Sequence, residues 1–180
     1  MQFLKNPKKS LGQNFLIDQN IITKIINVID INNKIVLEIG SGYGNLTNKI
    51  LTKNPKKVYA IEKDKQLFLY LKEFYKDSKK IEVINKDILN ILNIKNFGNN
   101  LIVFGNLPYN ISTQIIVSLI QVKKWPPFYD NLVFMFQKEV AERIIAKNGS
   151  KDFGRLSIIC NWKLEIKKHF HVSRNCFAPK

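Results

Sequence analysis

The chain has 180 residues, 45% of them hydrophobic, which suffices for one domain that buries its own core without disulfides or metal staples. Lysine and arginine number 29 against 14 acidic residues, and the resulting net charge of +15 excludes a typical metabolic enzyme. It favours a polyanionic partner, nucleic acid above all, with a solvated lysine surface as the alternative. No apolar run approaches the roughly 18 residues that cross a bilayer, and we expect a cytoplasmic protein without membrane contact.

Short apolar runs and amphipathic stretches alternate along the chain. Isoleucines at helical spacing behind Asp18 predict a helix over 19–30. Runs rich in β-branched or aromatic residues, typical of buried parallel strands, span 35–39, 58–61, 81–84, 101–104 and 132–136. Helical spacing between them covers 45–53, 65–76, 111–122 and 137–147, and a last apolar run, 156–166, predicts a sixth strand. The alternation predicts one α/β domain with a doubly wound, mostly parallel sheet.

A glycine-rich loop follows the first strand. Gly40, Gly42 and Gly44 alternate behind Glu38, which permits a tight turn and close approach of a ligand to the backbone at a helix amino terminus. A dinucleotide fingerprint needs a glycine where Asn45 stands, and no phosphate-binding loop with a terminal Gly-Lys-Ser/Thr occurs. The loop therefore predicts a nucleotide-like ligand without pyrophosphate, with a purely structural turn as the alternative.

Carboxylates stand at the ends of the next two strands. Glu62 can accept hydrogen bonds from both hydroxyls of a ribose, and Asp87 from the amino group of an adenine. Each alone also fits a surface charge or a helix cap. Together with the glycine loop they predict an adenosine without pyrophosphate, which indicates S-adenosylmethionine. Its sulfonium is cationic and suits Glu38 and the ring face of Tyr43.

The fourth strand ends in Asn106-Leu107-Pro108-Tyr109. This tetrapeptide offers a side-chain carbonyl, a main-chain carbonyl fixed by the proline and a flat ring, at the strand end where open α/β sheets bind ligands. Those groups suit the exocyclic amine of a planar base, because Asn106 Oδ1 and the carbonyl of Leu107 can accept its two hydrogens. The alternative is a strand-to-helix turn in which the asparagine caps and the proline kinks.

Taken together, the motifs resemble the ribosomal RNA adenine N6,N6-dimethyltransferases, in the right order and over nearly the whole chain. They are Leu11-Gly-Gln-Asn-Phe-Leu16, Glu38 to Gly44, Glu62, Asp87, Gly105-Asn-Leu-Pro-Tyr-Asn-Ile-Ser112, Gln137-Lys-Glu-Val140 and Gly154-Arg-Leu-Ser157. They are most similar to the branch that methylates two adjacent adenosines near the 3′ end of small-subunit ribosomal RNA. The resemblance implies a Rossmann-like class I methyltransferase that uses S-adenosylmethionine on the immature small subunit, and we expect a monomer.

The resemblance also implies roles for particular residues. Residues 1–17 form a basic segment that closes over the cofactor through Asn14 and Leu16. The remaining cofactor contacts are Gly40, Glu62, Asp87 and Asn106, and we add Glu38 and Gly42 from the loop. Asn106 and Tyr109 form the target-adenine site, which Phe177 joins as a second stacking ring. Without the resemblance, Phe177 is simply a core phenylalanine near the end of the chain.

Members of that family continue, beyond the point where this sequence stops at Lys180, with a further antiparallel strand and a small helical domain. We therefore expect a catalytic domain over 1–180 that lacks these parts, in which the strand over 156–166 has an exposed edge. A large-subunit methylase that confers macrolide resistance stays open, as does a non-catalytic nucleic-acid-binding or transcription accessory protein. A dinucleotide oxidoreductase is disfavoured by Asn45.

We assign no metal site. Cys160 and Cys176 lack a Cys-x-x-Cys spacing and are interpreted as packing residues. His169 and His171 stand two apart without nearby acidic or sulfur ligands.

Overall fold

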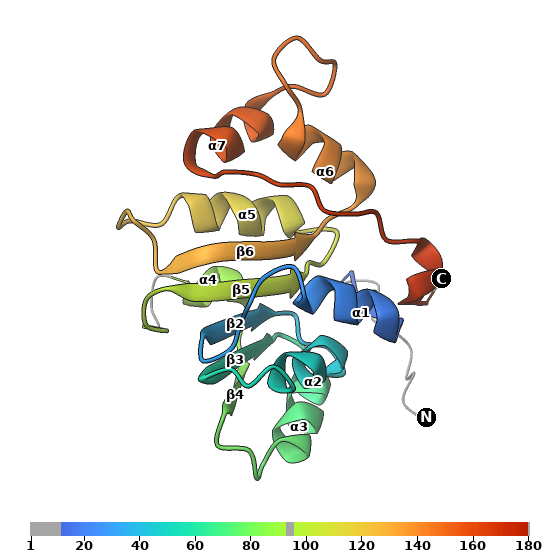
Figure 1. The fold of residues 1–180 in the computed structure, drawn as a ribbon, viewed down its shortest axis with the longest axis vertical. Helices are drawn as coiled ribbons and strands as arrows, with labels where there is room; N and C mark the ends of the chain where they lie inside the picture. The colour runs from blue at the N-terminus through green and yellow to red at the C-terminus, as the bar shows by residue number, and fades with distance from the viewer. Residues whose placement is uncertain (1–11, 93–95, 180) are drawn as a thin grey trace.

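The computed structural model describes residues 12–92 and 96–179, and its centre is a five-stranded sheet (Figure 1). The strand order is β4-β3-β2-β5-β6, and every neighbouring pair is parallel. The strands are β2 (Ile35–Ile39), β3 (Lys57–Glu62), β4 (Ile81–Asn85), β5 (Leu101–Asn106) and β6 (Tyr129–Met135). The expected doubly wound α/β architecture is confirmed.

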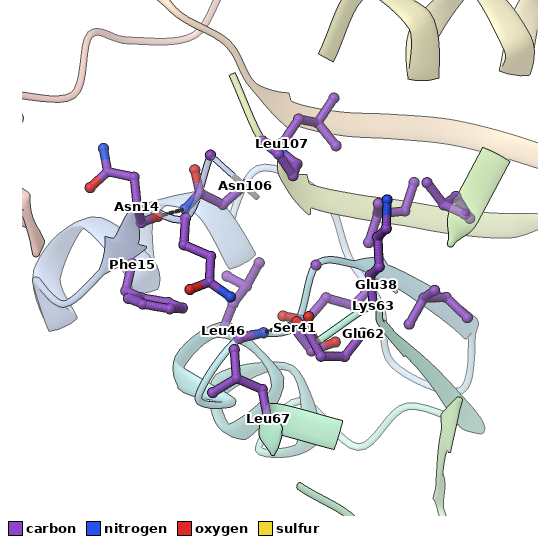
Figure 2. Close-up of a pocket in the computed structure, with 18 of the residues that line it drawn as sticks. Asn14, Phe15, Glu38, Ser41, Leu46, Glu62, Lys63, Leu67, Asn106 and Leu107 are labelled. Atoms are coloured by element: carbon purple, nitrogen blue, oxygen red, sulfur yellow. Dashed lines mark hydrogen bonds between the residues drawn. The ribbon is translucent and has the colours of Figure 1, made fainter. Parts of the chain in front are cut away.

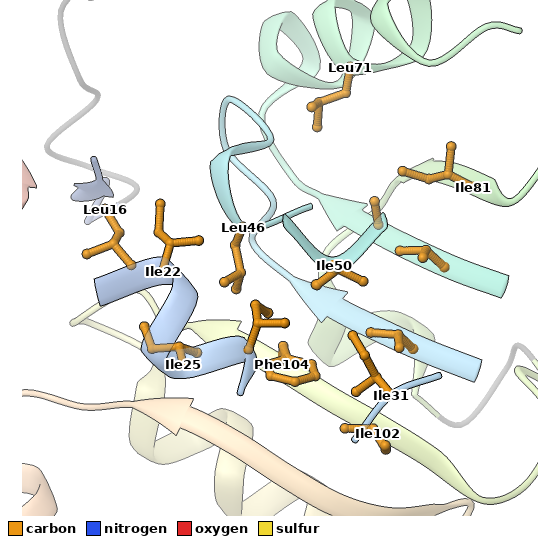
Figure 3. Close-up of a cluster of buried hydrophobic side chains, with 14 of the residues drawn as sticks. Leu16, Ile22, Ile25, Ile31, Leu46, Ile50, Leu71, Ile81, Ile102 and Phe104 are labelled. Carbon is orange, nitrogen blue, oxygen red and sulfur yellow. The ribbon is translucent and has the colours of Figure 1, made fainter. Parts of the chain in front are cut away.

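Helices cover both faces of the sheet. They are α1 (Gln19–Ile26), α2 (Asn45–Leu51), α3 (Lys65–Phe74), α4 (Ile88–Ile91), α5 (Ser112–Ile120), α6 (Lys138–Ile145) and α7 (Arg155–Lys163). Side chains alternate along each strand, so Val36 and Phe104 pack with α1, α2 and α3 on one face (Figure 3). Leu37 and Val103 pack with α4 and α5 on the other face.

The direction of the strand order reverses between β2 and β5, which lie side by side at the centre of the sheet. In open α/β sheets the crevice at such a reversal, outside the carboxyl ends of the strands, is where ligands bind. The glycine loop leaves β2 at this end, and Asn106 is the last residue of β5. The topology therefore brings the two strongest sequence motifs to one place.

The predicted sixth strand over 156–166 is wrong, because most of that segment is the helix α7. Ser157 Oγ accepts a hydrogen bond from the main-chain N–H of Gly154 and donates one to the main-chain oxygen of Arg143 at the end of α6. Leu156 and Cys160, four apart, pack on α5 and α6, whereas Trp162 faces solvent. Apolar residues lie on both sides of this helix, so the sequence shows no helical period. Because residues 155–163 are a helix, they present no exposed strand edge.

A second, two-stranded sheet joins the two ends of the described chain. β1 (Phe15–Leu16) pairs antiparallel with β7 (Phe177–Ala178), which follows the 3-10 helix η2 (Arg174–Cys176). The main-chain N–H of Ile17 donates to the main-chain oxygen of Cys176 at 2.8 Å. This pairing carries residue 177 to the segment that borders the crevice.

Residues 1–11, the first part of the segment expected to close over the cofactor, lie outside the described ranges. Lys180, the last residue of the expected catalytic domain, lies outside them as well. Within the described part of the chain no helix has the length and apolar character that crossing a membrane requires.

Candidate active site

A pocket opens at the carboxyl ends of β2, β3 and β5. Figure 2 shows Asn14 and Asn106 on one side of it and Glu38 and Glu62 on the other. All eight residues expected to contact the cofactor line this pocket, and so do Leu107 and Pro108. The eight are Asn14, Leu16, Glu38, Gly40, Gly42, Glu62, Asp87 and Asn106.

Glu62 organises the glycine loop. One of its carboxylate oxygens accepts from the main-chain N–H of Gly42 at 2.9 Å, and the other accepts from that of Asp64 at 2.8 Å. Gly42 has a φ of +57°, and a Cβ there would lie 3.0 Å from the ring of Phe15. The loop is thus held against the pocket by hydrogen bonds that a side chain at this position would disturb.

Glu38 lies beneath the loop, at the end of β2. Its side chain is buried, and the hydroxyl of Thr47 donates to it. Burial raises the pKa of Glu38 to about 8, although the hydrogen bond from Thr47 lowers it. Burial also raises the pKa of Glu62. Burial disfavours the charged form of both carboxyl groups. A cationic ligand would stabilise that charged form, so the pocket suits a positively charged ligand.

Asp87 lines the pocket and already has partners. Its carboxylate accepts from the main-chain N–H of Leu89, which makes it the N-cap of α4, and it forms an ion pair with Lys63 at 2.8 Å. The helix-cap interpretation of this residue is therefore correct. Because the carboxylate also lines the pocket, capping and ligand contact are compatible in one side chain.

Asn14 connects the two residues that carry the Asn-Leu-Pro-Tyr motif. Its main-chain oxygen accepts from Asn106 Nδ2 at 2.6 Å, and its own Nδ2 donates to the hydroxyl of Tyr109. Asn14 Oδ1 is buried without a hydrogen-bond partner among the described residues. A buried acceptor without a partner costs free energy, so this oxygen is suited to a donor brought by a ligand.

Tyr109 and Phe177 lie in a neighbouring groove rather than in the pocket. The groove runs along β6 and is also lined by Asn106, which is therefore common to both hollows. Tyr109 is 39% exposed, whereas Phe177 is 8% exposed and packs in the core with α1. Phe177 thus has the packing role that its position alone suggested, and it also faces the groove.

Sequence reasoning missed several residues that line the pocket. They are Gln13, Phe15, Ser41, Lys63 and Lys86, among others. Gln13 and Phe15 flank Asn14 in the amino-terminal motif and Ser41 lies between two of the loop glycines, so their neighbours were the available signal. The lysines had none, because the chain carries 29 basic residues and most have no distinguishing context.

The groups around the pocket fit a cationic nucleoside. The pocket is lined by carboxyl groups at the ends of three successive strands and by the unpartnered Asn14 oxygen, all of which accept hydrogen bonds. The glycine loop lets a ligand approach the backbone closely. Such a set suits a ligand rich in hydrogen-bond donors. Residues 4–180 match the model of the family described as ribosomal RNA adenine dimethylase. The chain belongs to the ribosomal RNA adenine dimethylase family.

Individual relatives agree with this membership. The small-subunit ribosomal RNA methyltransferase A of Pelagibacter ubique is 50% identical over 173 residues, which is 96% of this chain and 65% of that protein. A crystal structure of a dimethyladenosine transferase from Plasmodium falciparum superposes with a TM-score of 0.69 at 36% identity, covering 81% of this chain and 51% of that one. The 23S ribosomal RNA methyltransferase ErmE gives 0.63 at 26% identity, covering 75% and 52%.

The chain is shorter than these members of the dimethylase family. It spans between 62% and 66% of the length of the curated relatives it matches.

Proposed function

We propose that residues 1–180 are the catalytic domain of an enzyme that methylates adenine N6 in ribosomal RNA with S-adenosylmethionine as donor. The substrate is the pair of adjacent adenosines near the 3′ end of small-subunit RNA, and the enzyme acts as a monomer on the immature subunit in the cytoplasm. In this proposal residues 1–17 close over the donor. Support for the small-subunit substrate comes from relatives up to 50% identical, which are named as small-subunit ribosomal RNA methyltransferases.

One observation carries the proposal. Asn106 borders both the carboxylate-lined pocket and the groove that holds Tyr109 and Phe177. A methyl donor in the first hollow and an adenine in the second would therefore meet at this side chain. Glu62 binds the ribose and Asp87 the adenine amino group of the donor, while Asn14 and Glu38 face its charged end. When bound, S-adenosylmethionine supplies an electrophilic methyl group.

The chain's own residues then prepare the target amine. The N6 lone pair of adenine is delocalised into the ring and is a poor nucleophile. Asn106 Oδ1 and the carbonyl of Leu107 accept the two N6 hydrogens, which draws the nitrogen toward tetrahedral geometry and aims the lone pair at the donor. The hydrogen bond from Asn106 Nδ2 to Asn14 holds the amide so that its oxygen serves as the acceptor.

Two rings keep the target base out of its stack. Tyr109 and Phe177 hold the extruded adenine, and stacking of this kind contributes about 1 to 3 kcal/mol per base. After the first transfer one N6 hydrogen remains, so the second methylation uses one acceptor and needs room for the first methyl group.

The test is transfer of labelled methyl groups to under-methylated small subunits, followed by mapping of the label. We expect label on the two adjacent adenosines, and complete loss of transfer in Asn106→Ala with the fold retained by circular dichroism. Asn90→Ala, an exposed asparagine outside the pocket, is the matched control and should transfer normally. Methyl transfer by Asn106→Ala at the wild-type rate would contradict the role assigned to Asn106.

The same mapping tests a large-subunit substrate, which the likeness to ErmE keeps as the second candidate. Label on large-subunit RNA with none on small subunits would select that candidate.

A further inference from the structure

The two tryptophans of the chain lie together beside the groove that holds Tyr109 and Phe177, which Trp125 and Lys163 also line and Trp162 does not. Trp125 precedes β6 in the loop that follows α5, and Trp162 belongs to α7, which packs against α5 (Figure 1). The ammonium of Lys163 lies 4.6 Å from the ring centre of Trp125 and 4.2 Å from that of Trp162. We call these three residues the tryptophan clasp.

The clasp leaves much of both indole rings accessible. Trp162 is 73% exposed and Trp125 is 42% exposed. A clasp that only tied α7 to the loop between α5 and β6 would gain most by covering its rings, since apolar surface left in water contributes nothing to stability. Exposed aromatic side chains that lie together, rather than singly, are the kind of surface that marks binding sites.

The surroundings of the clasp are basic. Lys123 and Lys124 are exposed immediately before Trp125. Residues 121–130 and 161–168 together hold five lysines against Asp130 and Glu165, a net charge of +3. A second copy of this chain would bring like charge to the same place, whereas a polyanion is attracted to it.

We propose that the tryptophan clasp is a docking surface for unpaired bases of the ribosomal RNA, outside the segment that carries the target adenosines. The inference rests on the proposed function for the identity of the partner. Indole faces accept any base by stacking, and lysines beside them neutralise the phosphates of the same strand, which is the combination used by surfaces that bind single strands without sequence preference. The clasp therefore adds affinity and orients the RNA without taking part in methyl transfer.

The chain offers a direct probe, because Trp125 and Trp162 are its only tryptophans. Intrinsic tryptophan fluorescence therefore reports on these two side chains, and Trp125→Phe leaves as reporter Trp162, which does not line the groove that holds Tyr109 and Phe177. We expect a ten-nucleotide single-stranded oligoadenylate, added without any methyl donor, to quench the emission saturably. Trp125→Phe and Trp162→Phe, each with one reporter left, should both still be quenched, and a duplex RNA of the same length should quench much less.

Affinity is measured separately by anisotropy of the labelled oligonucleotide. Trp162→Ala should weaken binding about fivefold or more, the scale of a lost stacking contact, and Trp162→Phe should restore most of it. Phe74→Ala is the matched control, because Phe74 is also an exposed aromatic, 57% accessible, with Lys72 and Lys76 beside it in sequence. Its affinity should equal that of the wild type.

Three outcomes would overturn the proposal. They are RNA binding without quenching, equal losses in Trp162→Ala and Phe74→Ala, and a change of sedimentation in Trp162→Ala with RNA affinity intact, which would make the clasp a contact between copies. The assay contains no methyl donor, so it separates this inference from the proposed activity. An enzyme that transfers methyl groups but shows no quenching refutes the clasp alone, and quenching without transfer refutes the activity alone.

Discussion

Glu38 shows how burial alters a single residue in the pocket. The pKa of its carboxyl is raised from an ordinary 4.5 to about 8, so the folded chain binds a proton that the unfolded chain releases between these pH values. The free energy of unfolding should therefore fall as pH rises from about 4.5 to 8 and become level above that, as far as this group is concerned.

Urea denaturation at a series of pH values checks this expectation. Glu38→Gln resembles the protonated carboxyl and cannot ionise, so its stability should depend less steeply on pH, with a residual slope from Glu62, whose pKa is also raised. The free energy of unfolding of the variant should exceed that of the wild type by the largest amount near pH 9. Parallel curves for the two proteins would contradict the raised pKa of Glu38.

Phe177 can act as a core residue, as a stacking ring, or as both. Phe177→Leu keeps an apolar side chain in the core and should cost about 1 to 2 kcal/mol of stability. It removes the flat ring, so methyl transfer should fall by about tenfold if the ring holds the target base. Phe177→Tyr keeps the ring and should retain activity. Stability is measured by urea unfolding and activity at saturating donor, and full activity in Phe177→Leu would leave only the core role.

At the scale of an element, α7 owes its start to one buried hydroxyl. Ser157 is fully buried and its Oγ accepts from Gly154 at 3.1 Å and donates to Arg143 at 2.6 Å, which ties α7 to the end of α6. Ser157→Ala removes these two part-buried hydrogen bonds, each of which contributes about 0.5 to 1.5 kcal/mol, and should lower the free energy of unfolding by about 1 to 3 kcal/mol.

Urea unfolding of the two serine variants of this region tests that role. Ser150→Ala alters an exposed serine in the loop before α7 and should change stability by no more than about 0.5 kcal/mol. Equal losses in the two variants would mean that the hydroxyl of Ser157 is not what holds the helix.

At the scale of the whole molecule, the outer surface is more basic than the pocket. Glu38, Glu62 and Asp87 line the pocket beside Lys63 and Lys86, whereas most of the described lysines are exposed, and the net charge of the whole chain is +15. Such an arrangement suits a cationic ligand in the pocket and an anionic polymer on the outside.

RNA binding should consequently weaken with salt. The logarithm of the association constant should fall linearly with that of the salt concentration, by roughly tenfold or more between about 50 and 200 mM, through neutralisation of phosphates by lysine and arginine. Filter binding of a small-subunit RNA fragment measures the slope. A flat response would mean that the positive charge is only a solvated surface.

Local patterns determined much of this protein from the sequence alone. The five buried strands, the glycine loop and the acids at strand ends are read from neighbouring residues, because strand burial and turn chemistry depend on the residues themselves. The parallel strand order then follows from short right-handed connections, which is why Glu62 and Asp87 could be expected at one edge with Asn106.

Tertiary structure decided the rest, because contacts between distant segments leave no local trace. The apolar run over 156–166 fits a strand as well as a helix, and only packing against α5 and α6 makes it α7. The pairing of Leu16 with Phe177 and the contacts of Asn14 with Asn106 and Tyr109 join residues more than 90 positions apart. Likewise, only the fold brings Trp125 to Trp162, so the clasp could not be read from the sequence.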